Sequence, residues 1–355
     1  MMTRIKVLFI LPSSIGGAER VTVTIAKFLD RERYDVKFVV LTSSKGEKQS
    51  LIPEGYDVHY VKLRNIWDFT VTRLTRLFRK ERPQFVFSSL RYINVRVLAA
   101  AKLAGGVKAI VRNDNGLQTA RWDNRLLMRL TYRYAHLIIA QQEEMRQELI
   151  DVMHLSPEKI VAIPNPLNTD IIDQKAQEPS PFPEAHQVNY LWAARFFYNK
   201  GQDLLCRAFR LVSERQPDAH LYLIGRYDTS DAYFQQVRQY VETNHLEEKV
   251  HFIGEASNPF KYMRHCDCFV MPSRYEGLPN ALVEAMYLGR PVVATRCIPM
   301  ISRIVSDHYN GILVAPDDEQ QMAEAMISAL SLHDFKMTFQ PSRPEDFTKL
   351  FPIEP

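Results

Sequence analysis

Cysteine is scarce in this 355-residue chain. Its four cysteines are too few for the disulfide framework of a small secreted domain. Cys266-x-Cys268 also lacks the second pair of ligands that a structural zinc site would need. We therefore expect a reducing, cytoplasmic setting, in which Cys206, Cys266, Cys268 and Cys297 remain thiols.

Long hydrophobic runs are missing as well. The apolar run Val7–Leu11 stops at Pro12 and is followed by Gly16-Gly17, so it reads as a buried first strand and not as a signal peptide. No run approaches the ~18 apolar residues of a membrane-spanning helix. Apolar residues make up 46% of the chain and charged residues 24%, which predicts a globular protein long enough for two α/β domains.

Charge is unevenly distributed along the chain. Residues 1–165 hold 27 Lys and Arg against 16 Asp and Glu, a balance of +11, whereas the remainder carries −7. Four arginines at four-residue spacing would form a stripe on one helix, beside Leu126, Leu127, Leu130 and Tyr134; these are Arg121, Arg125, Arg129 and Arg133. A solvated face, an anionic membrane surface and nucleic acid are the alternatives for this stripe, and an amphipathic membrane-surface element is the one we develop.

The pattern of the chain changes twice. Short apolar runs alternate with helical patterns in both halves, which is typical of two doubly wound parallel sheets. The first alternation predicts a domain at 1–168, and the second predicts a domain at 188–335. The Pro-rich polar stretch between them predicts a linker at 169–187, and residues 336–355 form a tail. The expected strands are 6–11, 36–41, 58–61, 85–87, 109–112, 137–140 and 160–163, then 188–193, 221–224, 250–253, 268–271, 292–294 and 312–314. The expected helices are 18–29, 66–81, 93–104, 124–134 and 143–152, then 202–215, 232–244, 259–264, 279–288 and 319–329.

The most informative segment is Ser273–Met286. It follows an expected strand, and Pro279 is predicted at the first helical position, with Gly289 ending the helix. Glu276 in the entry loop and Glu284 two turns later place two carboxylates around one helix N-terminus. Backbone N–H groups of Gly277, Leu278 and Asn280 are expected to face the same opening, where the helix dipole favours an anion.

In each half, a further motif follows the first expected strand. Arg195 and Lys200 lie after 188–193, and a guanidinium fork with a mobile ammonium suits a diphosphate. Gly16 and Gly17 follow the first strand of the chain and let backbone amides approach a ligand at a helix N-terminus.

Weaker candidates end other expected strands. Gly225, Arg226 and Ile253 are placed where a nucleotide would lie in an open α/β sheet, with plain turns as the alternative. Arg112 and Asn113 end a strand of the first half and are candidates for the acceptor side. None of the 10 histidines falls inside a motif.

The segment from Glu276 to Glu284 resembles the E-x7-E signature of retaining glycosyltransferases of family 4, with Gly-Leu-Pro-Asn inside it and Gly-x-Pro-Val-Val-Ala-Thr after it. The resemblance covers most of residues 4–330 and implies the GT-B fold, two Rossmann-like domains facing a cleft. It implies that Glu276 lies by the donor sugar, that Glu284 binds the ribose, and that Arg195 and Lys200 bind the diphosphate. Pro279, with Gly277, Leu278 and Asn280, belongs to the same donor-binding segment, and Gly16-Gly17 would close over the donor phosphate or meet the acceptor.

The resemblance extends to enzymes that build bacterial surface glycans. It implies transfer of a hexose or N-acetylhexosamine from a nucleoside diphosphate sugar, by that likeness a UDP-sugar, to a lipid-linked acceptor on the inner face of the cytoplasmic membrane. Because the chain has no Asp-x-Asp, we expect no metal and no other cofactor. A sugar-nucleotide epimerase of the same fold and a basic nucleic-acid-binding protein are the alternatives.

Overall fold

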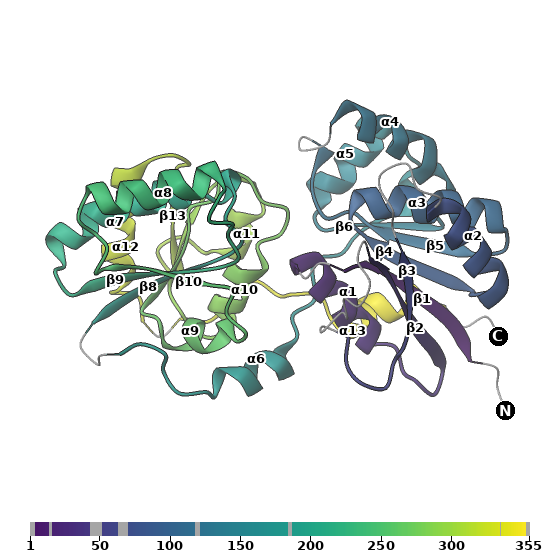
Figure 1. Cartoon of the computed structure of the whole chain (residues 1–355), viewed down its shortest axis with the longest axis horizontal. Coiled ribbons are helices and arrows are strands. Elements are labelled where there is room, and N and C mark those ends of the chain that lie inside the picture. Colours follow the sequence, from purple (N-terminus) through teal and green to yellow (C-terminus); the bar gives the residue numbers. More distant parts are fainter. Residues whose placement is uncertain are drawn as a thin grey trace. The chain divides into compact units, whose positions relative to one another are not determined.

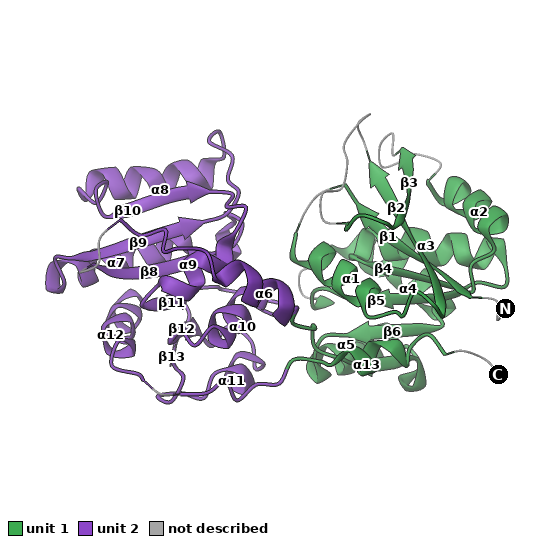
Figure 2. Cartoon of the chain, turned by 90° about the horizontal axis from the view of Figure 1, so that it is seen from below, with its two compact units in different colours: residues 1–167, 341–355 green, residues 168–340 purple. Residues whose placement is uncertain are grey.

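The computed structural model describes residues 4–13, 16–42, 52–62, 70–117, 121–183, 187–333 and 335–352. The chain forms two compact units (Figure 2). Unit 1 contains residues 1–167 and 341–355, and unit 2 contains residues 168–340. Each unit is a parallel β-sheet covered by helices (Figure 1), the arrangement that the alternating pattern predicts. The prediction of two Rossmann-like domains is confirmed.

Unit 1 contains a seven-stranded sheet in the order β3-β2-β1-β4-β5-β6-β7. Its strands are β1 Ile5–Pro12, β2 Tyr34–Thr42, β3 Asp57–Lys62, β4 Phe85–Ser89, β5 Lys108–Arg112, β6 Leu137–Ala140 and β7 Ile160–Ala162. Its helices are α1 Gly17–Lys27, α2 Thr70–Glu81, α3 Arg91–Ala104, α4 Trp122–Thr131 and α5 Glu143–Met153, with α13 Pro344–Thr348. The central strands are buried on both faces, which explains their near-continuous apolar sequences.

Unit 2 contains a six-stranded sheet in the order β10-β9-β8-β11-β12-β13. Its strands are β8 Val188–Ala193, β9 Ala219–Ile224, β10 Val250–Gly254, β11 Cys268–Met271, β12 Val292–Thr295 and β13 Gly311–Val314. Its helices are α6 Thr169–Ala176, α7 Gln202–Arg215, α8 Ala232–Thr243, α9 Pro259–His265, α10 Asn280–Tyr287, α11 Ile301–Ile304 and α12 Glu319–Ala329.

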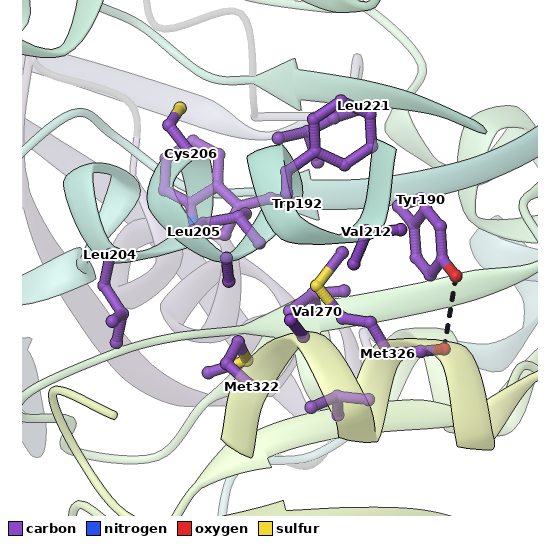
Figure 3. Packing of buried hydrophobic residues seen from close by; sticks show 14 of the residues in the cluster. Tyr190, Trp192, Leu204, Leu205, Cys206, Val212, Leu221, Val270, Met322 and Met326 are labelled. Carbon is purple, nitrogen blue, oxygen red and sulfur yellow. Dashed lines mark hydrogen bonds between the residues drawn. The ribbon is translucent and has the colours of Figure 1, made fainter. Parts of the chain in front are cut away.

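The core of unit 2 lies between its sheet and helices α7 and α12. Figure 3 shows Trp192 of β8 packed with Leu204 and Leu205 of α7. The hydroxyl of Tyr190 donates a hydrogen bond of 3.3 Å to the carbonyl of Met326. The Tyr190 ring is fully buried, and a buried tyrosine needs a hydrogen-bond partner for its hydroxyl. This bond also links β8 to α12. This packing fixes β8, whose carboxyl end begins the site described below.

Most expected elements have the observed bounds to within a few residues, but three differences matter. The polar stretch expected as a linker contains α6, whose start is capped by the Asn168 side chain accepting from the Ile171 amide. Asn258 donates a hydrogen bond of 2.8 Å to the Lys175 carbonyl, so α6 is part of unit 2. Pro279 is the N-cap of α10 and not its first helical residue. Residues 66–69 of the helix expected at 66–81 lie outside the described residues.

The third difference concerns the tail expected at 336–355, which is divided between the two units. The amide side chain of Asn310 contacts the carbonyl of Lys336 at 3.4 Å, and that segment belongs to unit 2. From Pro341 onward the chain packs with unit 1, where Phe347 and Phe351 are fully buried. The hydroxyl of Tyr34 in β2 donates a hydrogen bond of 2.7 Å to the Phe351 carbonyl. Phe347 and Phe351 are thus an integral part of the unit 1 core.

Candidate active site

The candidate site of unit 2 begins at the carboxyl ends of β8 and β11. These two strands pair with each other in the middle of the sheet. The chain leaves β8 toward β9 and β10 on one side and leaves β11 toward β12 and β13 on the other. The boundary between β8 and β11 is therefore a topological switch point, the place where open α/β sheets bind ligands.

An ion pair joins the loops that follow these two strands. The Lys200 ammonium lies 2.7 Å from each carboxylate oxygen of Glu276. Ser273 donates a hydrogen bond of 2.7 Å to Oε1 of the same carboxylate. Glu276 is 8% exposed and Lys200 is 23% exposed, so the pair is partly shielded from water while its cation stays accessible. A charge in such a place interacts more strongly with a ligand than one in bulk water.

Backbone contact between the two loops fixes this arrangement. Gly201, directly after Lys200, has φ +72°, and a Cβ there would lie 2.1 Å from the carbonyl oxygen of Pro272. Thr295 at the end of β12 donates its hydroxyl to the carbonyl of Ser273. The glycine is needed because any side chain would push the loops apart. The sequence indicated Lys200 and Glu276 but gave no role to Ser273 or Thr295; only their positions at strand ends could have suggested one.

The N-terminus of α10 lies in the same loop. Gly277, Leu278 and Pro279 are buried and Asn280 is half-buried. The Asn280 amide donates to the Leu278 carbonyl at 3.0 Å, so it is not the free N–H group that the sequence predicted at this helix N-terminus. Glu284 is half-buried, between the buried residues Val283 and Ala285.

Arg195 has different surroundings from Lys200. Its side chain is exposed, and its guanidinium carbon lies 5.5 Å from the centroid of the Phe197 ring, a cation–π contact. Its carbonyl accepts a hydrogen bond of 3.2 Å from the side chain of Gln202 in α7. The backbone of Arg195 is thus held in place, while its charge is presented to solvent.

The turn after β9 lies against the same loop. Gly225 donates a hydrogen bond of 2.8 Å to the Gly254 carbonyl, and a Cβ on Gly225 would lie 1.5 Å from the carbonyl oxygen of Ala194. Only glycine allows the ends of β8, β9 and β10 to approach so closely. Arg226 is exposed and Ile253 is 37% exposed, so both are accessible beside Arg195.

The first-half candidates lie in unit 1. Gly16 is the N-cap of α1 and Gly17 its first residue. Arg112 and Asn113, at the end of β5, are both buried, and Arg112 donates to the Asn165 side chain. Burial lowers the pKa of Arg112 to about 10. The sequence assigned these two residues to the acceptor side, but the structure does not present their side chains to solvent.

Two arginines of the stripe, Arg125 and Arg129, lie on α4. Arg121 is the N-cap of this helix, and Arg133 lies in the short helical turn Tyr132–Tyr134. Of α4 only Met128 is buried, and all four arginines of the stripe are exposed. Large apolar side chains are exposed beside them: Trp122, Leu126, Leu127, Leu130 and Tyr134. The expected amphipathic element is present. Among the residues that the structure describes, no helix combines the length and apolar character required to cross a bilayer.

Comparisons with known proteins agree with this geometry. The family model described as Glycosyltransferase Family 4 matches residues 15–171, and the model described as Glycosyl transferases group 1 matches residues 187–331. The chain belongs to family 4 of the glycosyltransferases.

Two relatives and one solved structure illustrate the likeness. An uncharacterized glycosyltransferase of Methanocaldococcus jannaschii is 27% identical over 65% of this chain and 61% of that protein. The N-acetylgalactosamine-N,N'-diacetylbacillosaminyl-diphospho-undecaprenol 4-alpha-N-acetylgalactosaminyltransferase of Campylobacter jejuni is 24% identical over 91% of this chain and 89% of that protein. The crystal structure of Anabaena HepE in complex with UDP and glucose superposes with a TM-score of 0.78 at 21% identity, covering 92% of this chain and 90% of that chain.

Proposed function

We propose that this glycosyltransferase moves a hexose or N-acetylhexosamine from a UDP-sugar to a lipid-linked glycan acceptor, with retention at the anomeric carbon. The observation that carries the proposal is the Lys200–Glu276 pair at the switch point, with both N–O distances at 2.7 Å. A cation for the diphosphate and a carboxylate for sugar hydroxyls thereby lie in direct hydrogen-bond contact. Two similar proteins support the proposal: a structure solved in complex with UDP and glucose, and a transferase named for a diphospho-undecaprenol acceptor.

In this mechanism Lys200 and Arg195 stabilise the charge that develops on the leaving diphosphate. Glu276 accepts hydrogen bonds from the donor sugar, and Glu284 accepts them from the ribose. The chain then supplies orientation and charge, and the departing phosphate takes the acceptor proton on the same face of the sugar.

Incubating the protein with a panel of nucleotide sugars and lipid-linked acceptors tests the proposal. We expect a glycosylated lipid and free nucleoside diphosphate, both dependent on acceptor and donor. Conversion of the donor to an epimer without any acceptor would instead identify a sugar-nucleotide epimerase. Binding of the basic unit 1 to nucleic acid, with no turnover of any nucleotide sugar, would contradict the whole proposal.

The proposal includes transfer without a metal, because two cationic side chains at the switch point can neutralise a diphosphate. We expect activity to be unchanged by EDTA. Loss of activity in EDTA that manganese or magnesium restores would overturn this part.

We also propose that α4 docks on the anionic cytoplasmic membrane face where a lipid-linked acceptor resides. The exposed arginines supply electrostatic attraction of about 1 kcal/mol each near an anionic surface, screened over roughly 10 Å by salt. The exposed Trp122 and Leu126 add apolar contact.

Binding to anionic vesicles should fall steeply with added salt, and exchange of Arg121, Arg125 and Arg129 for Gln should reduce it while leaving UDP binding unchanged. Failure of the wild-type protein to bind such vesicles at low salt would make the stripe a solvated face.

A further inference from the structure

Arg274, two residues before Glu276, makes a set of contacts that the reaction as proposed does not use. Its guanidinium forms a two-pronged ion pair with Asp203 of α7, with Nη1 and Nη2 each 2.8 Å from a carboxylate oxygen. The same group contacts Asp317 at 2.7 Å and donates to the Tyr198 carbonyl at 2.8 Å. It also lies 4.1 Å from the centroid of the Tyr198 ring. A single side chain thus joins its own loop to two segments that are distant in the sequence, 198–203 and the one that contains Asp317.

The backbone around Arg274 reinforces these contacts. The Arg274 amide donates to the Asn199 carbonyl at 2.8 Å, and the Asn199 side chain donates to the Tyr275 carbonyl at 3.4 Å. Asn199 directly precedes Lys200, and Tyr275 directly precedes Glu276. These two bonds therefore act on residues directly next to the Lys200–Glu276 pair.

The Asp203 end of the ion pair is built to stay charged. Its side chain is 11% exposed and that of Arg274 is 13% exposed. Tyr233 donates a hydrogen bond of 2.7 Å to Oδ1 of Asp203. Burial alone would raise the pKa of Asp203, but the bonds from Arg274 and Tyr233 outweigh it and lower the pKa to about 2. The fork geometry of arginine matches a carboxylate, which a lysine cannot reproduce.

We infer that Arg274 and Asp203 are positioning residues that set the placement of Lys200 against Glu276 and thereby donor turnover. We call this pair, with Asp317 and Tyr198, the Arg274 clasp. The inference rests on the proposed function for its effect on turnover, but the effect on the placement of Lys200 does not depend on it. The clasp touches neither the donor nor the acceptor in this account; it acts only through the two loops.

Arg207 provides a matched control. It also contacts Asp203, at 3.2 Å, and Glu319 at 2.7 Å, and it lies one helical turn along α7. Neither of these partners belongs to the Arg195–Lys200 or Ser273–Glu276 loop. Replacing Arg207 with Gln removes the same charge and one Asp203 contact while leaving the Arg274 bonds in place.

The first measurement is the reactivity of the Lys200 amine. Brief acetylation followed by peptide mass spectrometry, with Lys249 as an internal reference, should show faster labelling of Lys200 in Arg274→Gln than in the wild type. Arg207→Gln should match the wild type. Equal Lys200 labelling in all three proteins would overturn the inference, whether or not the protein turns over any nucleotide sugar.

The second measurement is donor turnover below the unfolding temperature of each variant. A displacement of about 1 Å in a catalytic group can cost about 100-fold, so we expect kcat/KM of Arg274→Gln to fall by that order. Arg274→Lys should be intermediate, and Arg207→Gln close to the wild type. The double variant Arg274→Gln/Asp203→Asn should regain thermal stability without regaining turnover, since it removes the unpaired carboxylate but not the displacement.

These outcomes separate the two hypotheses. Full turnover by folded Arg274→Gln would reduce the clasp to a stabilising contact. Absence of turnover in the wild type with every nucleotide sugar would contradict the proposed function, and the labelling result would still decide whether the clasp places Lys200.

Discussion

The two units share one architecture but differ in the polar residues at the carboxyl ends of their strands. In unit 2 the carboxyl ends of β8 and β11 carry a partly exposed ion pair, Lys200–Glu276. In unit 1 the end of β5 carries Arg112 and Asn113, both buried. The exposed charges of unit 1 include Arg125 and Arg129 of α4, away from that strand end in the sequence. The carboxyl ends of parallel strands can thus carry either exposed or buried polar residues, and the sequences of the loops that follow them determine which.

The comparison shows that the cations at these two strand ends differ in their exposure to solvent. The Arg112 guanidinium donates to Asn165, and its Nε and Nη1 are buried without a hydrogen-bond partner among the described residues. Burial lowers its pKa, as for a group removed from solvent. Lys200 keeps 23% of its side chain exposed and so remains accessible to an anion. We therefore expect Lys200 to be more accessible than Arg112 to a ligand.

The largest expected effect is a loss of stability in unit 1. Phe351→Ala removes a fully buried ring that lies 5.5 Å from Phe85 and 6.0 Å from Phe9, centroid to centroid. We expect a loss of about 3–5 kcal/mol in the free energy of unfolding, measured by urea denaturation. Leu103→Ala, at a side chain that is 58% exposed, should have almost no effect. Equal stability of the two variants would mean that the end of the chain is not part of the unit 1 core.

The second prediction removes the cations of unit 2. Lys200→Ala or Arg195→Ala should each lower kcat/KM by an amount equivalent to about 2–4 kcal/mol, because each removes a charge that stabilises the leaving diphosphate. Lys261→Ala removes a lysine of the same unit that pairs with Glu178 and should leave kcat/KM unchanged. Near-normal turnover in both site variants would count against the site.

The third prediction separates the two carboxylates by steady-state kinetics. Glu284→Ala should mainly raise the KM for the donor, through lost hydrogen bonds to the ribose. Glu276→Ala should mainly lower kcat. Each hydrogen bond to a charged group contributes about 1.5–3 kcal/mol. Indistinguishable kinetic profiles for the two variants would show that their roles are not separate.

The smallest effect concerns the stability of unit 2 in mild acid. His251 stacks on Tyr222 at 4.5 Å between centroids, and its Nε2 lies 3.0 Å from Nδ1 of His220. Burial, with the neighbouring His220, lowers the pKa of His251. The unfolded state therefore binds a proton more readily, so stability falls as the pH drops below about 6.5.

His251→Gln should make the melting temperature less dependent on pH between 7 and 5, measured by calorimetry. His333→Gln, at an exposed position, should keep the wild-type dependence. A pH dependence unchanged by His251→Gln would remove the histidine from the account.

The apolar runs predicted the strands of both sheets because a buried parallel strand needs little besides apolar residues. The short helices α6, α11 and α13 were not predicted, since they lie in proline-rich or polar stretches with few turns to reveal a period. A signal for α13 does exist: Pro344 at its start, Asp346 accepting from the Arg343 amide at 2.9 Å, and Phe347 and Phe351 four residues apart.

The candidate site was only partly predictable. Lys200, Glu276 and Arg195 stand in recognisable motifs, but Lys200 and Glu276 are 76 residues apart, and their contact depends on the pairing of β8 with β11. Arg274 and Asp203 carried no sequence signal, because an arginine in a loop and an aspartate in a first helical turn are common at the surface. Their pairing follows from tertiary structure alone.

The central claim is that unit 2 binds a nucleoside diphosphate sugar through Lys200 and its neighbours. Isothermal titration of the full chain with UDP-sugars tests it most directly. We predict a dissociation constant between about 1 μM and 1 mM, the usual range for Michaelis constants, for at least one UDP-sugar. Lys200→Ala should weaken binding of that sugar nucleotide, and Lys261→Ala should not. No binding of any nucleoside diphosphate sugar, or binding that is indifferent to Lys200 and Arg195, would contradict the account.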